Sequence, residues 1–245
     1  MFNSNAFAQA DDGNELFLDS IMSIQEVSVV ATKRAEIIRP QTLGGIELER
    51  LNSRSVADAL RYFSGVQLKD YGGIGGIKTV NIRSMGTNHV GVFYNGIQLG
   101  NAQNGQVDLG RYSLDNIEQI SLYNGQKSNI FQSAKDFASS SAIYIYTKRP
   151  TFEAGRNYNV SVQMKTGSFG LANPSVIWNQ RLGNNVSMSA NAEYTHANGR
   201  YKFRYQRMLP DGRVAYDTTA TRQNGDVEAL RTEIGFYGNI NGGHW

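Results

Sequence analysis

The chain has 245 residues, with 24 Lys and Arg, 21 Asp and Glu, three His and no Cys. A formal charge of +3 without a basic run gives no electrostatic case for a nucleic-acid partner. The missing cysteines exclude a disulfide scaffold, a thiol nucleophile and thiolate-bound metal. No apolar run approaches the roughly 20 residues of a transmembrane helix, so any membrane insertion has to use strands.

The first residues carry a pattern that is typical of export. Ala8-Gln9-Ala10 is an A-x-A sequence followed at once by Asp11 and Asp12, as at a signal-peptidase site. The basic and apolar regions that should precede such a site are missing. We therefore expect residues 1–10 to be the remnant of a signal peptide.

Residues 24–34, IQEVSVVATKR, contain Val27, Val29 and Val30, which favour extended structure. Two interpretations are open from these residues. The segment is either an ordinary first strand of the domain that follows, or a strand that pairs with the sheet edge of another chain. The residues alone favour the first.

From residue 45 to Pro150 the pattern is mixed α/β, in one domain of roughly 120 residues. A short helix is predicted through residues 56–63, capped by Asn52 or Ser53. Asn95-Gly96 predicts a tight hairpin between strands 90–94 and 97–99. Further strands are predicted at 66–68, 79–83, 118–123 and 141–147, with a glycine-rich loop at 71–76, a polar loop at 101–105 and a helical turn at 114–117. Ile120 and Leu122 are expected to point inward.

After Pro150 the pattern changes to long alternating segments. Strands are predicted at 159–167, 175–182, 185–196 and about 229–241, with Asn173-Pro174 as a boundary. One apolar and one polar face per strand suits a transmembrane barrel, although a soluble β-sandwich alternates too. The tight turn at 183–185 and the long polar stretch 198–226 match short periplasmic turns and long extracellular loops. Four strands cannot close a barrel, and the sequence stops directly after a strand, so we expect a truncated chain.

Nothing in the sequence predicts an enzyme, a cofactor or a metal site. His89, His196 and His244 lie far apart without ligand spacing. The glycines of GGIGGIK, residues 72–78, lack the spacing of a phosphate-binding loop and lead into a strand rather than a helix. Asp108, Asp115 and Asp136 show no calcium-loop register.

A series of short motifs follows in order along residues 51–148. They are VADALRYFSGVQL, GGIGG, NIRSMG at 81–86, GVFYNGIQLGN at 91–101, DNIEQISLYNGQKS at 115–128, and SAIYIYTK ending at Lys148. Their order and approximate spacing resemble the plug domain of TonB-dependent outer-membrane receptors. The sequence departs from the family pattern at Asn95, where Asp is usual, at Ser84, where Gly is usual, and in the segment NIFQSAKDFASSSA.

The resemblance implies a fold and a division of the chain. We expect an α+β plug domain followed by the first antiparallel strands of a large transmembrane β-barrel of about 22 strands, truncated. Residues 1–10 would be the signal-peptide remnant, 11–34 a periplasmic linker with a TonB box, 35–150 the plug, and 151–245 the N-terminal strands of the incomplete barrel. The implied location is the cell outer membrane.

The resemblance also implies functional residues. The TonB box would be Glu26, Val27, Ser28, Val29, Val30 and Ala31, which reverses the preference stated above for an ordinary first strand. Plug loops facing the substrate would contain Tyr71, Gly72, Gly73, Gly75, Gly76, Asn101, Gln103 and Asn104. Arg83 and Glu118 match charged positions that belong to polar networks at the boundary between plug and barrel, which is a structural role.

The function implied is energy-coupled import of a scarce, bulky nutrient of the cobalamin or siderophore type. The partners implied are TonB with its inner-membrane energising complex, a small molecule such as a corrinoid or metal chelate, and outer-membrane lipid, with a surface lipoprotein as an optional partner. The alternative is a ligand-sensing or binding protein on the same scaffold without net transport.

Overall fold

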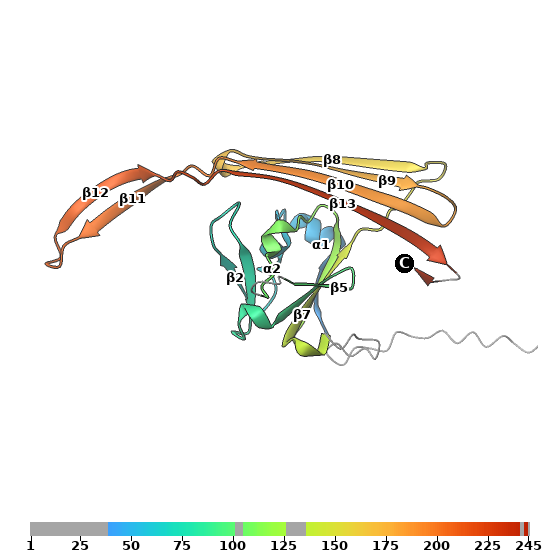
Figure 1. Cartoon of the computed structure of the whole chain (residues 1–245), viewed down its shortest axis with the longest axis horizontal. Coiled ribbons are helices and arrows are strands. Elements are labelled where there is room, and N and C mark those ends of the chain that lie inside the picture. Colours follow the sequence, from blue (N-terminus) through green and yellow to red (C-terminus); the bar gives the residue numbers. More distant parts are fainter. Residues whose placement is uncertain (1–38, 101–104, 126–135, 241–242, 245) are drawn as a thin grey trace, which may run out of the picture. The chain divides into compact units, whose positions relative to one another are not determined.

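The computed structural model describes residues 39–100, 105–125, 136–240 and 243–244 (Figure 1). Residues 36–245 form one compact unit. Two five-stranded sheets dominate it, each made from one contiguous half of the described chain. The predicted strand at 24–34 lies outside the described residues. Among the helices that the structure describes, none is long and apolar enough to cross a membrane.

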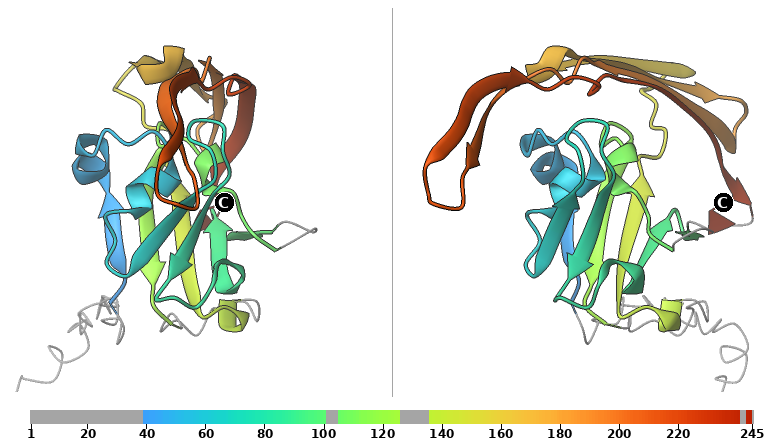
Figure 2. Two further views of the ribbon diagram at one scale, coloured as in Figure 1. Left: turned by 90° about the vertical axis from the view of Figure 1, so that its left-hand side faces the viewer. Right: turned by 60° about the vertical axis from the view of Figure 1, so that its left-hand side comes forward.

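The first sheet has the strand order β1-β6-β7-β4-β5, and its strands lie side by side in Figure 2. Only the central β4–β7 pair is parallel. The strands are β1 (Gln41–Gly44), β4 (Val90–Tyr94), β5 (Ile97–Leu99), β6 (Ile117–Tyr123) and β7 (Ser141–Thr147). Helices α1 (Gly45–Arg50) and α2 (Val56–Leu60), the separate hairpin of β2 (Val66–Asp70) and β3 (Lys78–Ile82), and short 3₁₀ helices at Thr87–His89, Leu109–Arg111 and Asp136–Ala138 complete this part.

The two faces of this sheet bury different side chains. Ile120, Leu122 and Ile143 belong to the main core together with α2 and β3, and all three are fully buried, as predicted for the first two. On β7 the alternate residue Tyr144 belongs to a second cluster, where its ring stacks on Phe93 at 4.8 Å. This alternation is the period of two that a strand imposes. Burial of apolar side chains in the main core holds α2 and the β2–β3 hairpin in place.

The predicted hairpin at Asn95-Gly96 is confirmed. Both residues have positive φ, 48° and 86°, as a two-residue turn of the primed type requires. The Asn95 side chain adds a tertiary contact, because its Oδ1 accepts from the Thr147 N–H at 3.0 Å and its Nδ2 donates to the Thr147 Oγ1 at 2.9 Å.

The predicted helix is present but shorter, and its predicted cap is wrong. Ser55, not Asn52 or Ser53, caps α2, since its Oγ accepts from the Asp58 N–H at 3.3 Å. The Ser55 N-cap is a strong helix start because it satisfies an otherwise unpaired N–H. Residues 114–117, predicted as a helical turn, form a turn closed by a hydrogen bond from the Ile117 N–H to the Leu114 carbonyl oxygen. Helix α1 and strand β1 were not predicted.

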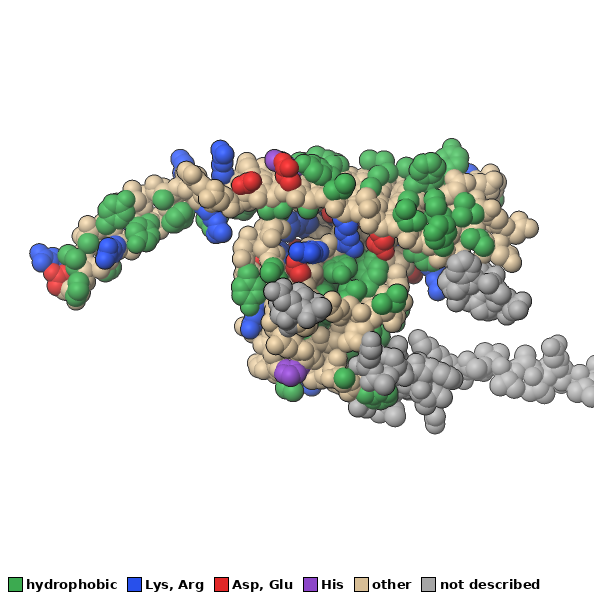
Figure 3. All heavy atoms as spheres, in the orientation of Figure 1, with side chains coloured by type: hydrophobic (Ala, Val, Ile, Leu, Met, Phe, Trp, Pro, Cys, Tyr) green, Lys and Arg blue, Asp and Glu red, His purple; other side chains and the backbone are tan. Residues whose placement is uncertain are grey.

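The second sheet has the order β14-β13-β10-β9-β8 and is antiparallel throughout. Its strands are β8 (Tyr158–Gly167), β9 (Leu171–Arg181), β10 (Val186–Ala197), β13 (Val227–Ile240) and β14 (Gly243–His244), with a 3₁₀ turn at Ser168–Gly170. The predicted alternation holds. Val162 and Leu230 are 76% and 72% exposed, whereas Ser189 and Asn191 on the other face are buried. Apolar side chains gather over this sheet in Figure 3.

Strand β9 begins at Leu171, so the prediction of a boundary at Asn173-Pro174 is wrong. Pro174 lies in an interior strand although it cannot donate to the ladder. The neighbouring Asn173 compensates, because its Nδ2 donates to the Tyr194 carbonyl oxygen at 3.0 Å and to the Thr195 Oγ1 at 2.8 Å. A side-chain amide thus replaces a backbone donor.

The stretch 198–226, predicted as one long polar loop, contains a hairpin instead. Strands β11 (Lys202–Met208) and β12 (Val214–Thr221) pair with each other in a separate two-stranded sheet. The many charged residues concealed an alternating pattern of aromatic and polar side chains. At the base of this hairpin, the backbones of Gly199 and Gly225 approach closely.

We expect Gly199→Ala to destabilise the hairpin more than Gly212→Ala. Both glycines have positive φ, which costs an alanine roughly 1–2 kcal/mol. A Cβ on Gly199 would also lie 1.9 Å from the Gly225 carbonyl oxygen, whereas one on Gly212 meets nothing within 4 Å. Proteolysis of the hairpin in the folded protein would measure the difference, and equal cleavage rates in the two variants would contradict the close contact.

Candidate functional site

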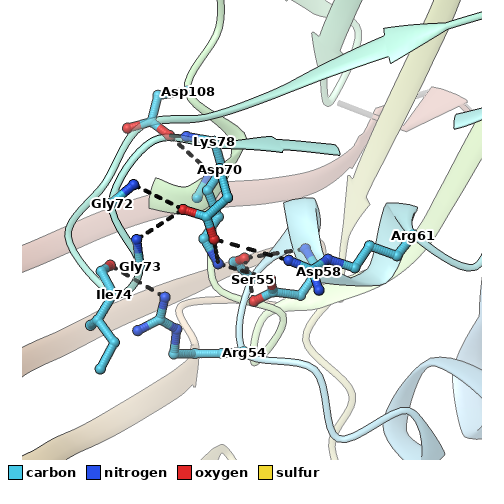
Figure 4. Close-up of polar contacts among 11 residues, drawn as sticks. Arg54, Ser55, Asp58, Arg61, Asp70, Gly72, Gly73, Ile74, Lys78 and Asp108 are labelled. Carbon is cyan, nitrogen blue, oxygen red and sulfur yellow. Dashed lines mark hydrogen bonds and ion pairs between the residues drawn. The ribbon is translucent and has the colours of Figure 1, made fainter. Parts of the chain in front are cut away.

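A buried lysine organises the glycine-rich loop. Lys78 opens β3, and its side chain is only 6% exposed. Its Nζ donates to the Asp58 Oδ1 at 2.8 Å and lies 3.7 Å from the Asp70 Oδ2 (Figure 4). Asp58 comes from α2 and Asp70 from the end of β2. Burying an ammonium group is costly unless it is paired, so the two carboxylates explain how this lysine can be buried.

Asp70 and a third carboxylate, Asp108, fix the loop backbone. The Asp70 Oδ1 accepts from the N–H groups of Gly72 and Gly73 at 3.1 and 2.9 Å, and the Asp108 Oδ1 accepts from the Lys78 N–H at 2.9 Å. A Cβ on Gly76 would lie 2.4 Å from the Gly72 nitrogen, so this turn requires glycine there. The loop is therefore held by charge-assisted hydrogen bonds.

The pKa values of Asp58 and Asp70 agree with this arrangement. Burial by itself would raise the pKa of Asp58, but the hydrogen bonds from Lys78 and Ser55 outweigh it and the pKa is lowered. Burial also tends to raise the pKa of Asp70. The Gly73 and Gly72 N–H groups and the Lys78 charge outweigh this effect and bring the pKa of Asp70 below its ordinary value. Both carboxylates are ionised at neutral pH and neutralise the lysine.

A cavity of about 600 Å³ adjoins this centre. It is lined by Arg54, Asp58, Asp70, Gly72, Gly73, Ile74 and Lys78 from the first half of the described chain, and by Ser168, Phe169, Leu171, Gly199, Tyr201, Arg222 and Gly225 from the second. The loop residues that were predicted to face the substrate lie in different places. Gly72 and Gly73 line this cavity, while Gly75 and Gly76 line a second one of about 520 Å³ beside Arg231. Tyr71 is exposed and lines neither, and Asn101, Gln103 and Asn104 lie outside the described residues.

Side chains of the first half bind the polar face of the second sheet. Asp115, whose side chain is 5% exposed, forms an ion pair with Lys165 and accepts from the Ser175 Oγ at 2.7 Å. The Tyr94 hydroxyl donates to Glu233 at 2.9 Å. Burial and then the Glu233 charge raise the pKa of Tyr94, so it stays a donor.

Three further contacts extend this polar boundary. The Thr147 Oγ1 lies 3.0 Å from the Tyr237 hydroxyl. The Arg231 guanidinium donates to the Arg111 carbonyl oxygen at 2.6 Å and lies over the Tyr112 ring at 4.8 Å. Strands β8, β9 and β13 contribute five residues to these contacts: Lys165, Ser175, Arg231, Glu233 and Tyr237. All five have odd numbers, and the odd-numbered residues form the polar face of these strands.

Arg83 and Glu118, the residues predicted for such a network, are placed elsewhere. Both side chains are exposed, and within the described residues neither makes a hydrogen bond or an ion pair. Their role stays a prediction, whereas the polar boundary seen in the described residues uses Asp115 and Tyr94. In the sequence, the polar residues that alternate with apolar ones along these strands were the signal that could have indicated which residues contact the first domain.

The arrangement defines a class of protein: a small α+β domain, with a glycine-rich loop held by buried charges, bound to antiparallel strands that are apolar on their other face. Residues 32–135 match the family model described as TonB-dependent Receptor Plug Domain. Over these residues the chain is similar to the plug domain of TonB-dependent receptors.

Solved structures show the same fold at low identity. The FrpB iron transporter from Neisseria meningitidis is similar with a TM-score of 0.58 and 11% identity, over 83% of this chain and 30% of that one. A structure described as copper transporter OprC is similar with a TM-score of 0.55 and 14% identity, over 82% of this chain and 28% of that one. The chain thus spans under a third of the length of these structures.

Proposed function

We propose that this chain forms part of an outer-membrane receptor that imports a scarce, bulky nutrient with energy delivered through TonB. The observation that carries the proposal is the match of residues 32–135 to the plug-domain model, together with the polar contacts that join this domain to the alternating strands. A domain bound by hydrogen bonds and ion pairs rather than by a shared apolar core can be rearranged without unfolding the strands that it contacts.

The outward side chains of the second sheet support the membrane location. Val160, Val162 and Met164 on β8 and Leu230 and Ile234 on β13 are at least half exposed. Exposed apolar surface on this scale is unfavourable in water and favourable against lipid acyl chains. Outer-membrane lipid is therefore the partner that we assign to this face.

TonB is the partner that we assign to residues 26–31. The segment Glu26–Ala31 lies outside the described residues, and its assignment rests on sequence. The three valines of this segment favour extended structure, which suits addition to a sheet edge, where main-chain hydrogen bonds supply the affinity. The ligand class that we favour is a metal chelate of the siderophore type ahead of a corrinoid, since the similar folds named above include an iron and a copper transporter.

Deleting residues 24–32 in the full-length receptor is the direct test. Import of the ligand should stop while binding at the cell surface is unchanged, because the deletion removes the energy input and not the binding site. A deletion of equal length at 12–20 is the matched control and should leave import intact. Import that survives the first deletion would contradict energy coupling through this segment. Surface binding without import in the unaltered receptor would indicate the sensing alternative.

A further inference from the structure

A small cavity of about 240 Å³ lies at the end of the second sheet, where β9 turns into β10. The tight turn 183–185 lines it on one side, and residues of the segment 149–152, between β7 and β8, line it on another. It shares no lining residue with the two cavities beside the glycine-rich loop. Pockets for bulky small molecules measure about 300–1,000 Å³, so this one suits a single small group.

The charge at this small cavity is positive and uncompensated. Arg149 and Arg181 line it, and no carboxylate does. Within the described residues neither arginine forms an ion pair with a carboxylate. Arg156 in the same connecting segment differs, because its Nη1 lies 3.3 Å from the Glu153 Oε2. The cavity therefore offers two guanidinium groups to an anion from outside the described chain.

The Arg181 side chain is held in place by an aromatic ring. Its guanidinium carbon lies 4.9 Å from the centroid of the Phe152 ring, and its backbone N–H donates to the Asn157 carbonyl oxygen at 2.7 Å. A cation over a ring face is attracted by the ring and keeps its N–H groups available. The side-chain amides of Asn184 and Asn185 also line the cavity and make no hydrogen bond within the described part of the chain. The site is thus rich in donors, as an oxyanion requires.

The strand register places this cavity next to the apolar surface of the sheet. Arg181 pairs with Ser187, and Ser187 pairs with Tyr237, so the three lie in one row across β9, β10 and β13. One residue along the strands, about 3.4 Å, Tyr158 and Phe236 point to the opposite face and are more than half exposed. Apolar side chains gather over this end of the sheet in Figure 3. Aromatic residues at strand ends mark the membrane interface of a barrel, which is the level of the lipid headgroups.

We propose that this cavity binds the phosphate of an anionic phospholipid, on the side of the membrane where the short turns of the strands lie. Guanidinium groups match phosphate oxygens with paired hydrogen bonds. A lipid, rather than a free anion, is the occupant because the apolar face one residue away accommodates its acyl chains. The bound phosphate would join Arg149 of the connecting segment to Arg181 of β9. The inference rests on the proposed function for the membrane location alone, and it adds a headgroup site to the acyl-chain contact assigned above.

Lipid titration of the delipidated full-length receptor in an uncharged detergent tests the site. Phosphatidylglycerol carries a net negative charge, whereas the choline group of phosphatidylcholine cancels the charge of its phosphate. We expect phosphatidylglycerol to bind more tightly and its affinity to fall as salt is added, since the attraction is partly electrostatic. Equal affinities for the two lipids would overturn the proposal. Displacement of the lipid by an equal concentration of inorganic phosphate would also overturn it, because the site would then belong to a free anion.

Variants locate the binding. Arg149→Gln and Arg181→Gln should each weaken phosphatidylglycerol binding roughly five-fold, the loss expected for one basic residue at an anionic membrane surface. Arg156→Gln is the matched control, because Arg156 pairs with Glu153 and does not line the cavity; this substitution should leave the lipid affinity unchanged. Added phosphatidylglycerol should raise the thermal unfolding temperature of the unaltered receptor and of Arg156→Gln more than that of the other two variants, since a ligand of the folded state stabilises it. Unchanged affinity in both Arg149→Gln and Arg181→Gln would overturn the proposal.

Failure of this inference is distinguishable from failure of the proposed function. If import requires residues 24–32 while Arg149→Gln and Arg181→Gln bind the lipid as the unaltered receptor does, the headgroup site is wrong and the transport function stands. If the two variants lose lipid affinity while no import requires residues 24–32, the headgroup site stands and the transport function is wrong.

Discussion

Lys78→Met is expected to destabilise the plug domain by about 3 kcal/mol, because it leaves the partly buried Asp58 without its paired cation and Asp70 with only the 4.0 Å contact to Arg61. The glycine-rich loop should loosen at the same time, since Asp70 holds the N–H groups of Gly72 and Gly73. The free energy of unfolding and the rate of proteolysis within residues 71–77 would measure the two effects.

The double variant Lys78→Met with Asp58→Asn is the control for this prediction. It removes the cation together with its closest anion, so part of the lost stability should return. Lys69→Met changes a lysine that forms no ion pair within the described residues and should alter stability by less than about 0.5 kcal/mol. If Lys78→Met behaved like Lys69→Met, the buried centre would not hold the loop.

Asp115→Ala should weaken the attachment of the plug domain to the second sheet by about 3 kcal/mol. The substitution leaves the Lys165 ammonium without its carboxylate at a place where its side chain is only 19% exposed, and it removes the acceptor of the Ser175 hydroxyl. Thermal unfolding of the folded chain would measure the loss. Exposure of the polar face of β8 to a water-soluble label would report detachment separately from unfolding.

Glu153→Ala is the matched comparison for Asp115→Ala. Glu153 also pairs with a basic residue, Arg156, but both side chains are mostly exposed, and such pairs contribute at most about 1 kcal/mol. The contrast between these two carboxylates isolates burial as the cause. Equal losses in the two variants would contradict the anchoring role of Asp115.

Local patterns predicted much of the fold. Asn95-Gly96 predicted the β4–β5 hairpin because the turn type depends on two residues alone. The alternation in β8, β10 and β13 predicted their two faces because a strand has a fixed period of two. The plug domain was recognised from motifs in a consistent order, although no single motif was specific, and the family match confirms it.

The sequence by itself therefore determined most of the strands, their apolar and polar faces, and the plug domain, because these depend on neighbours in the chain. Only the tertiary structure decided the site. Lys78 meets Asp58 at a separation of 20 residues, and Asp115 meets Lys165 at a separation of 50. The cavity beside Arg54 is completed by Phe169 and Arg222 from the far half of the chain. Ion pairs and cavities have no sequence period, so the glycine-rich loop was predicted whereas the charges that hold it were not.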